Sequence, residues 1–202
     1  DVLSCPQIPV LYLRRSDELQ ARTLGVEDPM LVLTSDMVEK LNAQELLFII
    51  GREIAHIQHQ HILYQEIGMI FPELIEAFSI VTLGLSSIIS TGLRYALYHW
   101  AQMAEYTADR GGLLACQDET AAKWVMAKWA GLPESQWKSF LLQAFEDQAR
   151  TFEGITPRTF DRIIGFVLGE TNWSIARMQE LMQWIDDPDY EQLLARRPGS
   201  LK

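Results

Sequence analysis

The sequence of 202 residues is poor in cysteine and in basic side chains. Its two cysteines, Cys5 and Cys116, lie far apart and form no C-x-x-C pair, so we expect free thiols and no cysteine-based metal site. Lys and Arg number 17 against 27 Asp and Glu, and this net charge of −10 argues against a nucleic-acid partner. A hydrophobic content of 48% excludes a wholly disordered chain and is typical of a globular protein.

The sequence also lacks a long hydrophobic run. Its longest uncharged stretch, Ala77 to Leu93, lies between Glu76 and Arg94 and contains six Ser and Thr residues. As a helix it would span roughly 25 Å, less than the ~30 Å of a bilayer core. We therefore favour a helical hairpin buried in protein, with a membrane-dipping segment as the less favoured alternative. The sequence opens at Asp1 without Met, which indicates a processed or shortened chain and leaves localisation open.

The first 34 residues have the pattern of a small sheet. Val10–Leu13 and Met30–Leu33 are short apolar runs of strand-forming residues, with Gly25 and Pro29 between them. The helical pattern begins at Ser35. The fold class is therefore α+β and predominantly helical, in a single domain over residues 1–202. Its parts are the sheet (1–34), a first helical part (35–117) and a helical C-terminal part (118–202).

Capping residues set the expected helix boundaries. Ser35 is expected to cap a short helix over Asp36–Leu41. Asn42 and Glu45 have the spacing of a capping box, which predicts a helix of about twenty residues ending at His61 or Tyr64. Further helices are predicted from Pro72, over Arg94–Gln117 with a weak point at Gly111-Gly112, and over Glu119–Ala130, Ser135–Thr151, Thr159–Leu168 and Ser174–Trp184.

Polar residues gather on one face of the helix that starts at Asn42. Three of the four histidines lie close together at its end, and positions 52, 53 and 56 fall on one arc at 100° per residue. Isoleucines occupy the other faces, so these polar groups are expected to be buried and to need partners. Glu105 and Asp109, four residues apart on a second predicted helix, supply such partners. Either arc alone is typical of a solvated surface, but the two together favour a functional site.

These motifs resemble those of the HtpX-like and CAAX-prenyl-protease-like zinc metallopeptidases, which belong to the gluzincin group. Gly51-Arg-Glu-Ile-Ala-His56 is similar to their H-E-x-x-H helix, and His61 matches a further histidine found five residues on. Glu105-Tyr-Thr-Ala-Asp109 matches their E-x-x-A-D segment. The similarity covers roughly residues 8 to 165 and implies a gluzincin-like fold with a small N-terminal sheet.

The resemblance implies a site for peptide-bond hydrolysis by a zinc metalloendopeptidase. Glu53 would be the general base, His56 and Glu105 zinc ligands, and Asp109 a carboxylate that orients a ligand imidazole. His61 would be a capping residue or would support a ligand.

A second family segment, T-H-P followed by an arginine, is matched only in part. Pro157 is kept and Arg162 has the matching spacing, but Thr156 stands at the histidine position. Arg162 would polarise a substrate carbonyl or hold Asp109. A surface position on its helix explains Arg162 equally well.

The main departure from the family is Arg52, which stands where the motif has its first zinc-binding histidine. A guanidinium has no lone pair for a metal and stays protonated at physiological pH. Its charge should instead pair with Glu53, Glu105 or Asp109. Zinc is therefore the cofactor that the resemblance implies, while Arg52 argues that this chain lacks it.

Three hypotheses follow. The first is a pseudo-peptidase, or peptide-binding module, with lost or impaired zinc-dependent hydrolysis. The second is an active zinc metalloendopeptidase with an engineered Arg52 or a metal site rebuilt from His56, His59 and Glu105, for which Glu105 would have to reach ~5 Å further. The third is a chance match in an unrelated helical protein.

The expected partner is an extended peptide at the edge of the small sheet, and the oligomeric state stays open. Four further residues are expected to be structural: His99, Trp124, Trp129 and Trp137.

Overall fold

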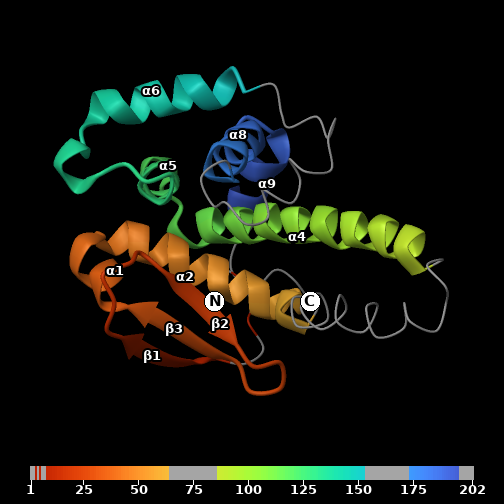
Figure 1. Ribbon diagram of the computed structural model, residues 1–202. Coiled ribbons are helices and arrows are strands. Elements are labelled where there is room, and N and C mark those ends of the chain that lie inside the picture. Colours follow the sequence, from red (N-terminus) through yellow and green to blue (C-terminus); the bar gives the residue numbers. More distant parts are fainter. Residues whose placement is uncertain (1–2, 4, 6–7, 64–85, 153–172, 196–202) are drawn as a thin grey trace.

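A three-stranded sheet, a central pair of helices and a cluster of further helices make up the fold in the computed structural model, which describes residues 3, 5, 8–63, 86–152 and 173–195. Figure 1 shows the sheet against one side of α2 (Ala43–Gln58). Helix α4 (Ser86–Cys116) runs back beside α2 on the side away from the sheet. The remaining helices pack beyond α4 and around the ends of the pair, so the pair lies at the centre.

The sheet has the order β1-β3-β2. Strand β1 (Val10–Arg14) pairs in parallel with β3 (Met30–Thr34), and β2 (Ala21–Leu24) pairs with β3 antiparallel. Leu31 and Leu33 of the middle strand are buried and join the main hydrophobic core. The predicted N-terminal sheet is confirmed, with β2 as a strand that the sequence pattern did not predict.

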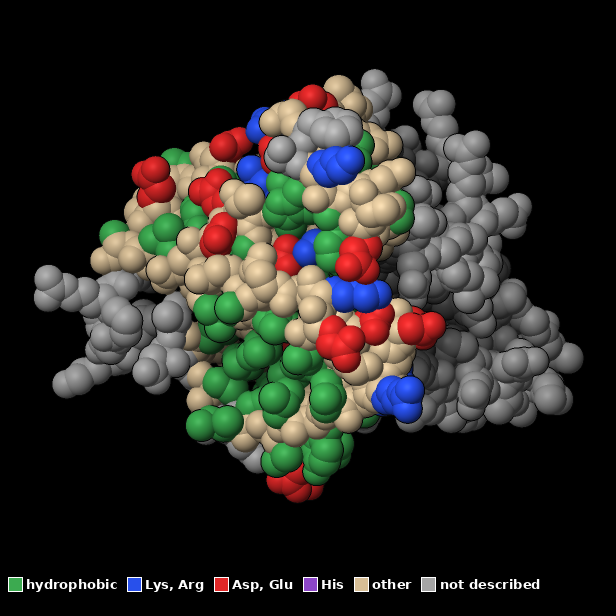
Figure 2. All heavy atoms as spheres, turned by 90° about the vertical axis from the view of Figure 1, so that its left-hand side faces the viewer, with side chains coloured by type: hydrophobic (Ala, Val, Ile, Leu, Met, Phe, Trp, Pro, Cys, Tyr) green, Lys and Arg blue, Asp and Glu red, His purple; other side chains and the backbone are tan. Residues whose placement is uncertain are grey.

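Strand β1 is exposed along its whole length, although four of its five residues are hydrophobic. Figure 2 shows hydrophobic side chains gathered on the lower part of that face of the molecule, where the sheet lies. β1 therefore adds little to the core and forms one outer edge of the sheet.

The short helix α1 (Ser35–Lys40) begins one residue earlier than expected. Thr34 is at its N-cap, and no side chain caps it. The prediction that Ser35 caps this helix is wrong because the Ser35 hydroxyl is engaged elsewhere. It accepts a hydrogen bond from the Ser16 N–H at 3.1 Å and donates to the Ser16 carbonyl at 2.9 Å. A tertiary contact thus takes the place of the local cap.

The capping box at the start of α2 is confirmed. The Asn42 side chain accepts from the backbone N–H groups of Gln44 and Glu45, and the Glu45 carboxylate accepts from the Asn42 N–H. The helix ends at Gln58, earlier than the predicted His61 or Tyr64. His59 is its C-cap, and this earlier end separates the last two histidines of the cluster from the regular helix.

Glu45 has a second partner that fixes α5 (Glu119–Trp129) against the start of α2. The Lys128 ammonium lies 2.7 and 2.8 Å from the two Glu45 carboxylate oxygens, and both side chains are buried. The Trp137 ring covers the same ammonium at 4.0 Å from the ring centroid. This pair sets where the end of α5 lies relative to α2, and the end of α5 carries Trp129.

Helix α4 is longer than predicted, and it continues through Gly111-Gly112 without a break. The two glycines are sites of close helix contact, where α4 meets α2. A Cβ at Gly112 would lie 2.7 Å from the Phe48 carbonyl oxygen, and a Cβ at Gly51 would collide with the Cβ of Ala115. The absence of these side chains allows the two backbones to approach, which explains why glycine is tolerated inside a helix.

The described residues of the C-terminal part, 118–152 and 173–195, are mostly helical, as predicted. The predicted Glu119–Ala130 and Ser174–Trp184 correspond to α5 and α8 (Trp173–Ile185), and Ser135–Thr151 is divided between a 3₁₀ turn (Glu134–Gln136) and α6 (Ser139–Arg150). A last helix, α9 (Pro188–Ala195), was not predicted. The predicted helices at Pro72 and Thr159–Leu168 and the first part of Ala77–Leu93 lie outside the described residues. Within the described ranges, no helix is both long enough and apolar enough to span a bilayer.

The close contact of α2 and α4 gives a first testable prediction. Gly51→Ala should lower the free energy of unfolding by about 1–3 kcal/mol, because the added methyl overpacks the contact. Adding Ala115→Gly removes the group that the new methyl meets and should restore part of the loss. Urea unfolding of the wild type, the single variant and the double variant measures both effects. A single variant as stable as the wild type would show that the helices are further apart.

Candidate active site

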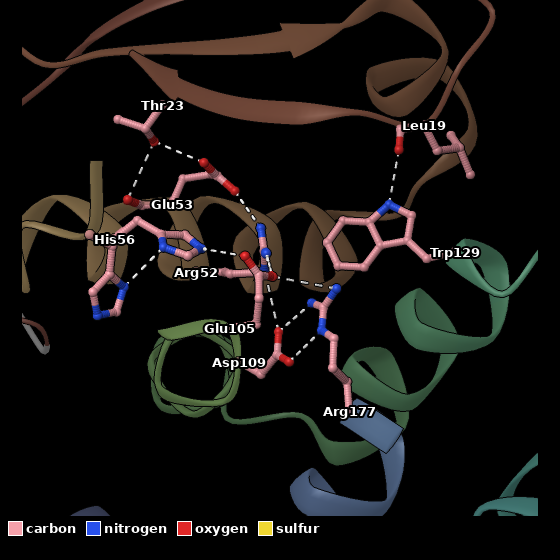
Figure 3. A network of polar contacts seen from close by, with 10 residues as sticks. Leu19, Thr23, Arg52, Glu53, His56, Glu105, Asp109, Trp129 and Arg177 are labelled. Carbon is pink, nitrogen blue, oxygen red and sulfur yellow. Dashed lines mark hydrogen bonds and ion pairs between the residues drawn. The ribbon is translucent and has the colours of Figure 1, made fainter. Parts of the chain in front are cut away.

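The two polar arcs predicted from the sequence face each other across the α2–α4 contact. Arg52, Glu53 and His56 come from α2, and Glu105 and Asp109 come from α4 (Figure 3). A chance match of motifs does not predict that these segments are neighbours, so the arrangement argues against the third hypothesis.

Arg52 is buried at the centre of this cluster and bonds to all three carboxylates. Its Nη1 donates to Glu53 Oε1 at 2.6 Å, its Nε donates to Asp109 Oδ1 at 3.2 Å, and its Nη2 donates to Glu105 Oε2. The predicted pairing of Arg52 with carboxylates is therefore confirmed. Burial alone would lower the pKa of Arg52, but the three carboxylates outweigh burial and raise it above its ordinary value.

A second arginine, Arg177 of α8, completes the cluster from the side away from the sheet. Its Nε donates to Asp109 Oδ2 at 2.7 Å and its Nη2 to Asp109 Oδ1 at 2.5 Å, a bidentate pair. Its Nη1 lies 3.7 Å from Glu105 Oε2. The sequence analysis missed this residue. The available signal was an arginine on the apolar stripe of the predicted Ser174–Trp184 helix.

Arg162, which the resemblance associated with Asp109 or with a substrate carbonyl, lies outside the described residues. In the structure Arg177 holds Asp109. The role of Arg162 stays a prediction.

Glu53 connects the cluster to the sheet. The hydroxyl of Thr23 in β2 donates to Glu53 Oε2 at 2.8 Å, and it also lies 3.4 Å from the Glu53 backbone oxygen. Burial raises the pKa of Glu53, although Arg52 and the Thr23 hydroxyl act in the opposite direction. The carboxylate expected to be the general base is thus enclosed between an arginine and a threonine.

His56 keeps one ring nitrogen turned toward Glu105 and the other toward His61. Its Nε2 lies 3.7 Å from Glu105 Oε1, and its Nδ1 lies 3.0 Å from the Nδ1 of His61. Burial, followed by the charge of Arg52, lowers the pKa of His56 to about 3, and burial lowers that of His61 to about 4. Both rings are therefore neutral at pH 7. His61 thus contacts His56 directly, which agrees with the second of the two roles expected for it.

Glu105 remains ionised although its side chain is partly buried. Burial would raise its pKa, but the charges of Arg52 and Arg177 outweigh that effect and hold the pKa at about 2. Its carboxylate bonds to Arg52 and faces His56.

Trp129 lies over both arginines. Its ring centroid is 5.2 Å from the Arg52 guanidinium carbon and 5.0 Å from that of Arg177, and its Nε1–H donates to the Leu19 carbonyl at 2.9 Å. Trp124 and Trp129 pack against the core, as predicted. The sequence analysis did not predict the additional position of Trp129 beside the cluster (Figure 3).

The residues of this cluster do not fit a zinc ion held by the family's geometry. Among the described residues, no group of three or more His, Cys, Asp or Glu side chains is placed to hold a metal. His56 and Glu105 supply two suitable atoms, but the guanidinium of Arg52 stands at the third ligand position and is bonded to the Glu105 carboxylate. His59 is exposed, and its ring stacks on that of His61 at 5.5 Å between centroids.

Fold and cluster together define a metallopeptidase-like protein built around an H-E-x-x-H-type helix, with arginine in the first histidine's place. The chain belongs to peptidase family M48, whose model matches residues 3–183. It is 26% identical over 199 residues to the plastoglobule-localized metallopeptidase 48, chloroplastic, of Arabidopsis thaliana. That match covers 94% of this chain but 56% of the relative, so the chain spans little more than half the relative's length. No solved structure matches the chain.

The position of Arg52 gives a prediction about metal binding. Arg52→His restores the third ligand and should raise zinc affinity by orders of magnitude, because ligands already facing one point bind a metal together. Competition with a chromogenic chelator measures the affinity. Arg110→His, a surface substitution on α4 at an arginine 45% exposed in its side chain, is the matched control. If Arg52→His binds no more zinc than the wild type, the family's ligand geometry is not present here.

The lowered pKa of His56 gives a prediction about stability. The unfolded chain takes up a proton on His56 below about pH 6.5, whereas the folded chain does so only near pH 3, so the fold loses stability as the pH falls through this window. Between pH 7 and pH 5 this group should cost about 2 kcal/mol. His56→Gln keeps a hydrogen-bonding side chain and should remove that part of the loss. Equal losses in both proteins, measured by urea unfolding at the two pH values, would contradict this account.

Proposed function

We propose that this chain is a metallopeptidase-like protein that has lost zinc-dependent hydrolysis and binds an extended peptide. The observation that carries the proposal is the buried Arg52 guanidinium, which replaces the motif's first histidine as the missing third ligand and bonds to Glu53, Glu105 and Asp109. A protonated guanidinium repels a metal cation and offers it no lone pair.

The same bonds occupy the groups that hydrolysis would need. A general base must be able to accept a proton from water, but both oxygens of Glu53 already accept hydrogen bonds, one from Arg52 and one from Thr23. Glu105 is similarly engaged by Arg52. Arg52 therefore supports the proposal in two ways, since it opposes the metal and also ties up the base.

Peptide binding is proposed at the outer edge of β2. In the described part of the chain, β2 pairs only with β3, so its other edge has backbone groups available for a further strand. The Thr23 hydroxyl anchors this strand to Glu53 of α2. A peptide added in extended form would gain main-chain hydrogen bonds and would run beside the cluster.

The alternative is an active zinc metalloendopeptidase with a rebuilt metal site. His56 Nε2 and Glu105 Oε1, 3.7 Å apart, still face each other and support this alternative. For metal to bind there, Arg52 would have to leave Glu105 and a third ligand would have to take its place.

A binding and cleavage assay distinguishes the two functions. Protein purified without chelator should contain far less than one zinc per chain by elemental analysis, and it should bind members of an extended-peptide library without cutting them. Peptides with alternate N-methylated amides lose main-chain hydrogen bonds worth about 1 kcal/mol each, so they should bind roughly tenfold or more weakly.

Glu53→Gln is the matched variant for the same assay. Under the proposal, any residual peptide cleavage is unchanged by this substitution and by chelator, as judged by mass spectrometry of the peptides. Cleavage that stops both with chelator and in Glu53→Gln would establish the alternative function instead.

A further inference from the structure

We propose that Arg52 and Arg177 act together as an internal counter-cation, which takes the electrostatic place of a divalent metal at this site and excludes one. Arg177 is the positioning residue in this pair. The inference shares with the proposed function only the placement of Arg52. It adds that α8, through Arg177, supplies half of the positive charge of the pair.

The charges of the cluster support a pair rather than a single arginine. Glu53, Glu105 and Asp109 bring three negative charges, and the side chains of Glu53 and Asp109 are only 3% and 2% exposed. One guanidinium would leave two of these charges uncompensated in a buried place, which is costly. Two guanidiniums bring the same charge as a divalent metal ion.

The hydrogen bonds show which carboxylates each arginine contacts. Arg52 reaches all three, whereas Arg177 holds Asp109 with two bonds and approaches Glu105 to 3.7 Å. Both oxygens of Asp109 are thereby occupied by guanidinium groups. The resemblance implies that Asp109 orients a ligand imidazole. Here its oxygens bond to Arg177 instead.

Trp129 holds the two guanidiniums at one place. Its ring lies about equally far from both, at 5.2 and 5.0 Å, and its Nε1–H is fixed by the Leu19 carbonyl. Such contacts favour positive charge over the ring. The two arginines, from α2 and α8, are therefore organised as one unit.

This arrangement predicts that Arg177 opposes zinc even after the third ligand has been restored. In Arg52→His, Arg177 still neutralises Asp109 and remains close to Glu105, so both groups are less available to a metal. Combining Arg52→His with Arg177→Gln should therefore tighten zinc binding roughly tenfold or more relative to Arg52→His alone, the scale of effects on groups that support metal ligands. The double variant should also show the larger rise in Tm on addition of zinc.

Chelator competition measures the zinc affinities, and differential scanning calorimetry with and without zinc measures Tm. Arg52→His with Arg110→Gln is the matched control, because it also removes one positive charge facing α8, from an exposed pair with Glu180. It should stay within about twofold of Arg52→His, as expected for a screened surface charge. Arg52→His with Arg177→Lys keeps the charge, so its zinc affinity should lie closer to that of Arg52→His than to that of the Gln variant.

Three results would overturn the inference. The first is a Gln double variant that binds zinc no more tightly than Arg52→His, since Arg177 would then only support the fold. The second is a double variant that stays unfolded even with zinc, since a metal would then be unable to replace the charges removed. The third is a wild-type Tm that falls with chelator, whereas an unchanged Tm is expected. The comparison of variants does not depend on whether the wild type binds a peptide, so the peptide-binding part of the proposed function can fail separately.

Discussion

The interaction on which the cluster depends is the bonding of one buried guanidinium to three carboxylates. Arg52 compensates charges from α2 and α4, and its removal would leave several of them buried with too few partners. Each neighbouring element approaches the cluster through a particular contact. The glycines bring α2 and α4 together, Arg177 ties in α8, and Trp129 covers the two arginines from the end of α5. Local charge balance and the packing of the helices are therefore parts of one arrangement.

A second buried ion pair helps to hold this arrangement in register. Glu45 closes the capping box of α2, and its carboxylate also accepts hydrogen bonds from the ammonium of Lys128. Lys128 immediately precedes Trp129, so the pair fixes the end of α5 close to the start of α2. The same side chain thus starts the helix that carries Arg52 and places the ring that lies over it.

Short-range patterns predicted much of this structure from the sequence. The capping box and the 3.6-residue periodicity gave the start of α2 and the shared face of Arg52, Glu53 and His56, because both depend only on near neighbours. The pairing of Arg52 with acidic groups followed from the cost of burying its charge.

Other features depend on contacts between distant segments, and the sequence pattern does not contain them. The Ser35 hydroxyl could either cap α1 or bond to a distant segment. In the structure it bonds to Ser16, so it does not cap the helix. Arg177 meets Asp109 from another helix, 68 residues away. Strand β2 is only four residues long, and its place is set by pairing with β3 and by the bond from Thr23 to Glu53.

A guanidinium differs from a metal ion in one further respect, which is that it belongs to the chain. The positive charge of Arg52 is covalently part of the polypeptide, so its presence at the cluster does not depend on the free concentration of any ion. It cannot be withdrawn by a stronger binder or exchanged for a competing metal. A protein with this centre therefore has the positive charge of Arg52 in place as soon as it folds.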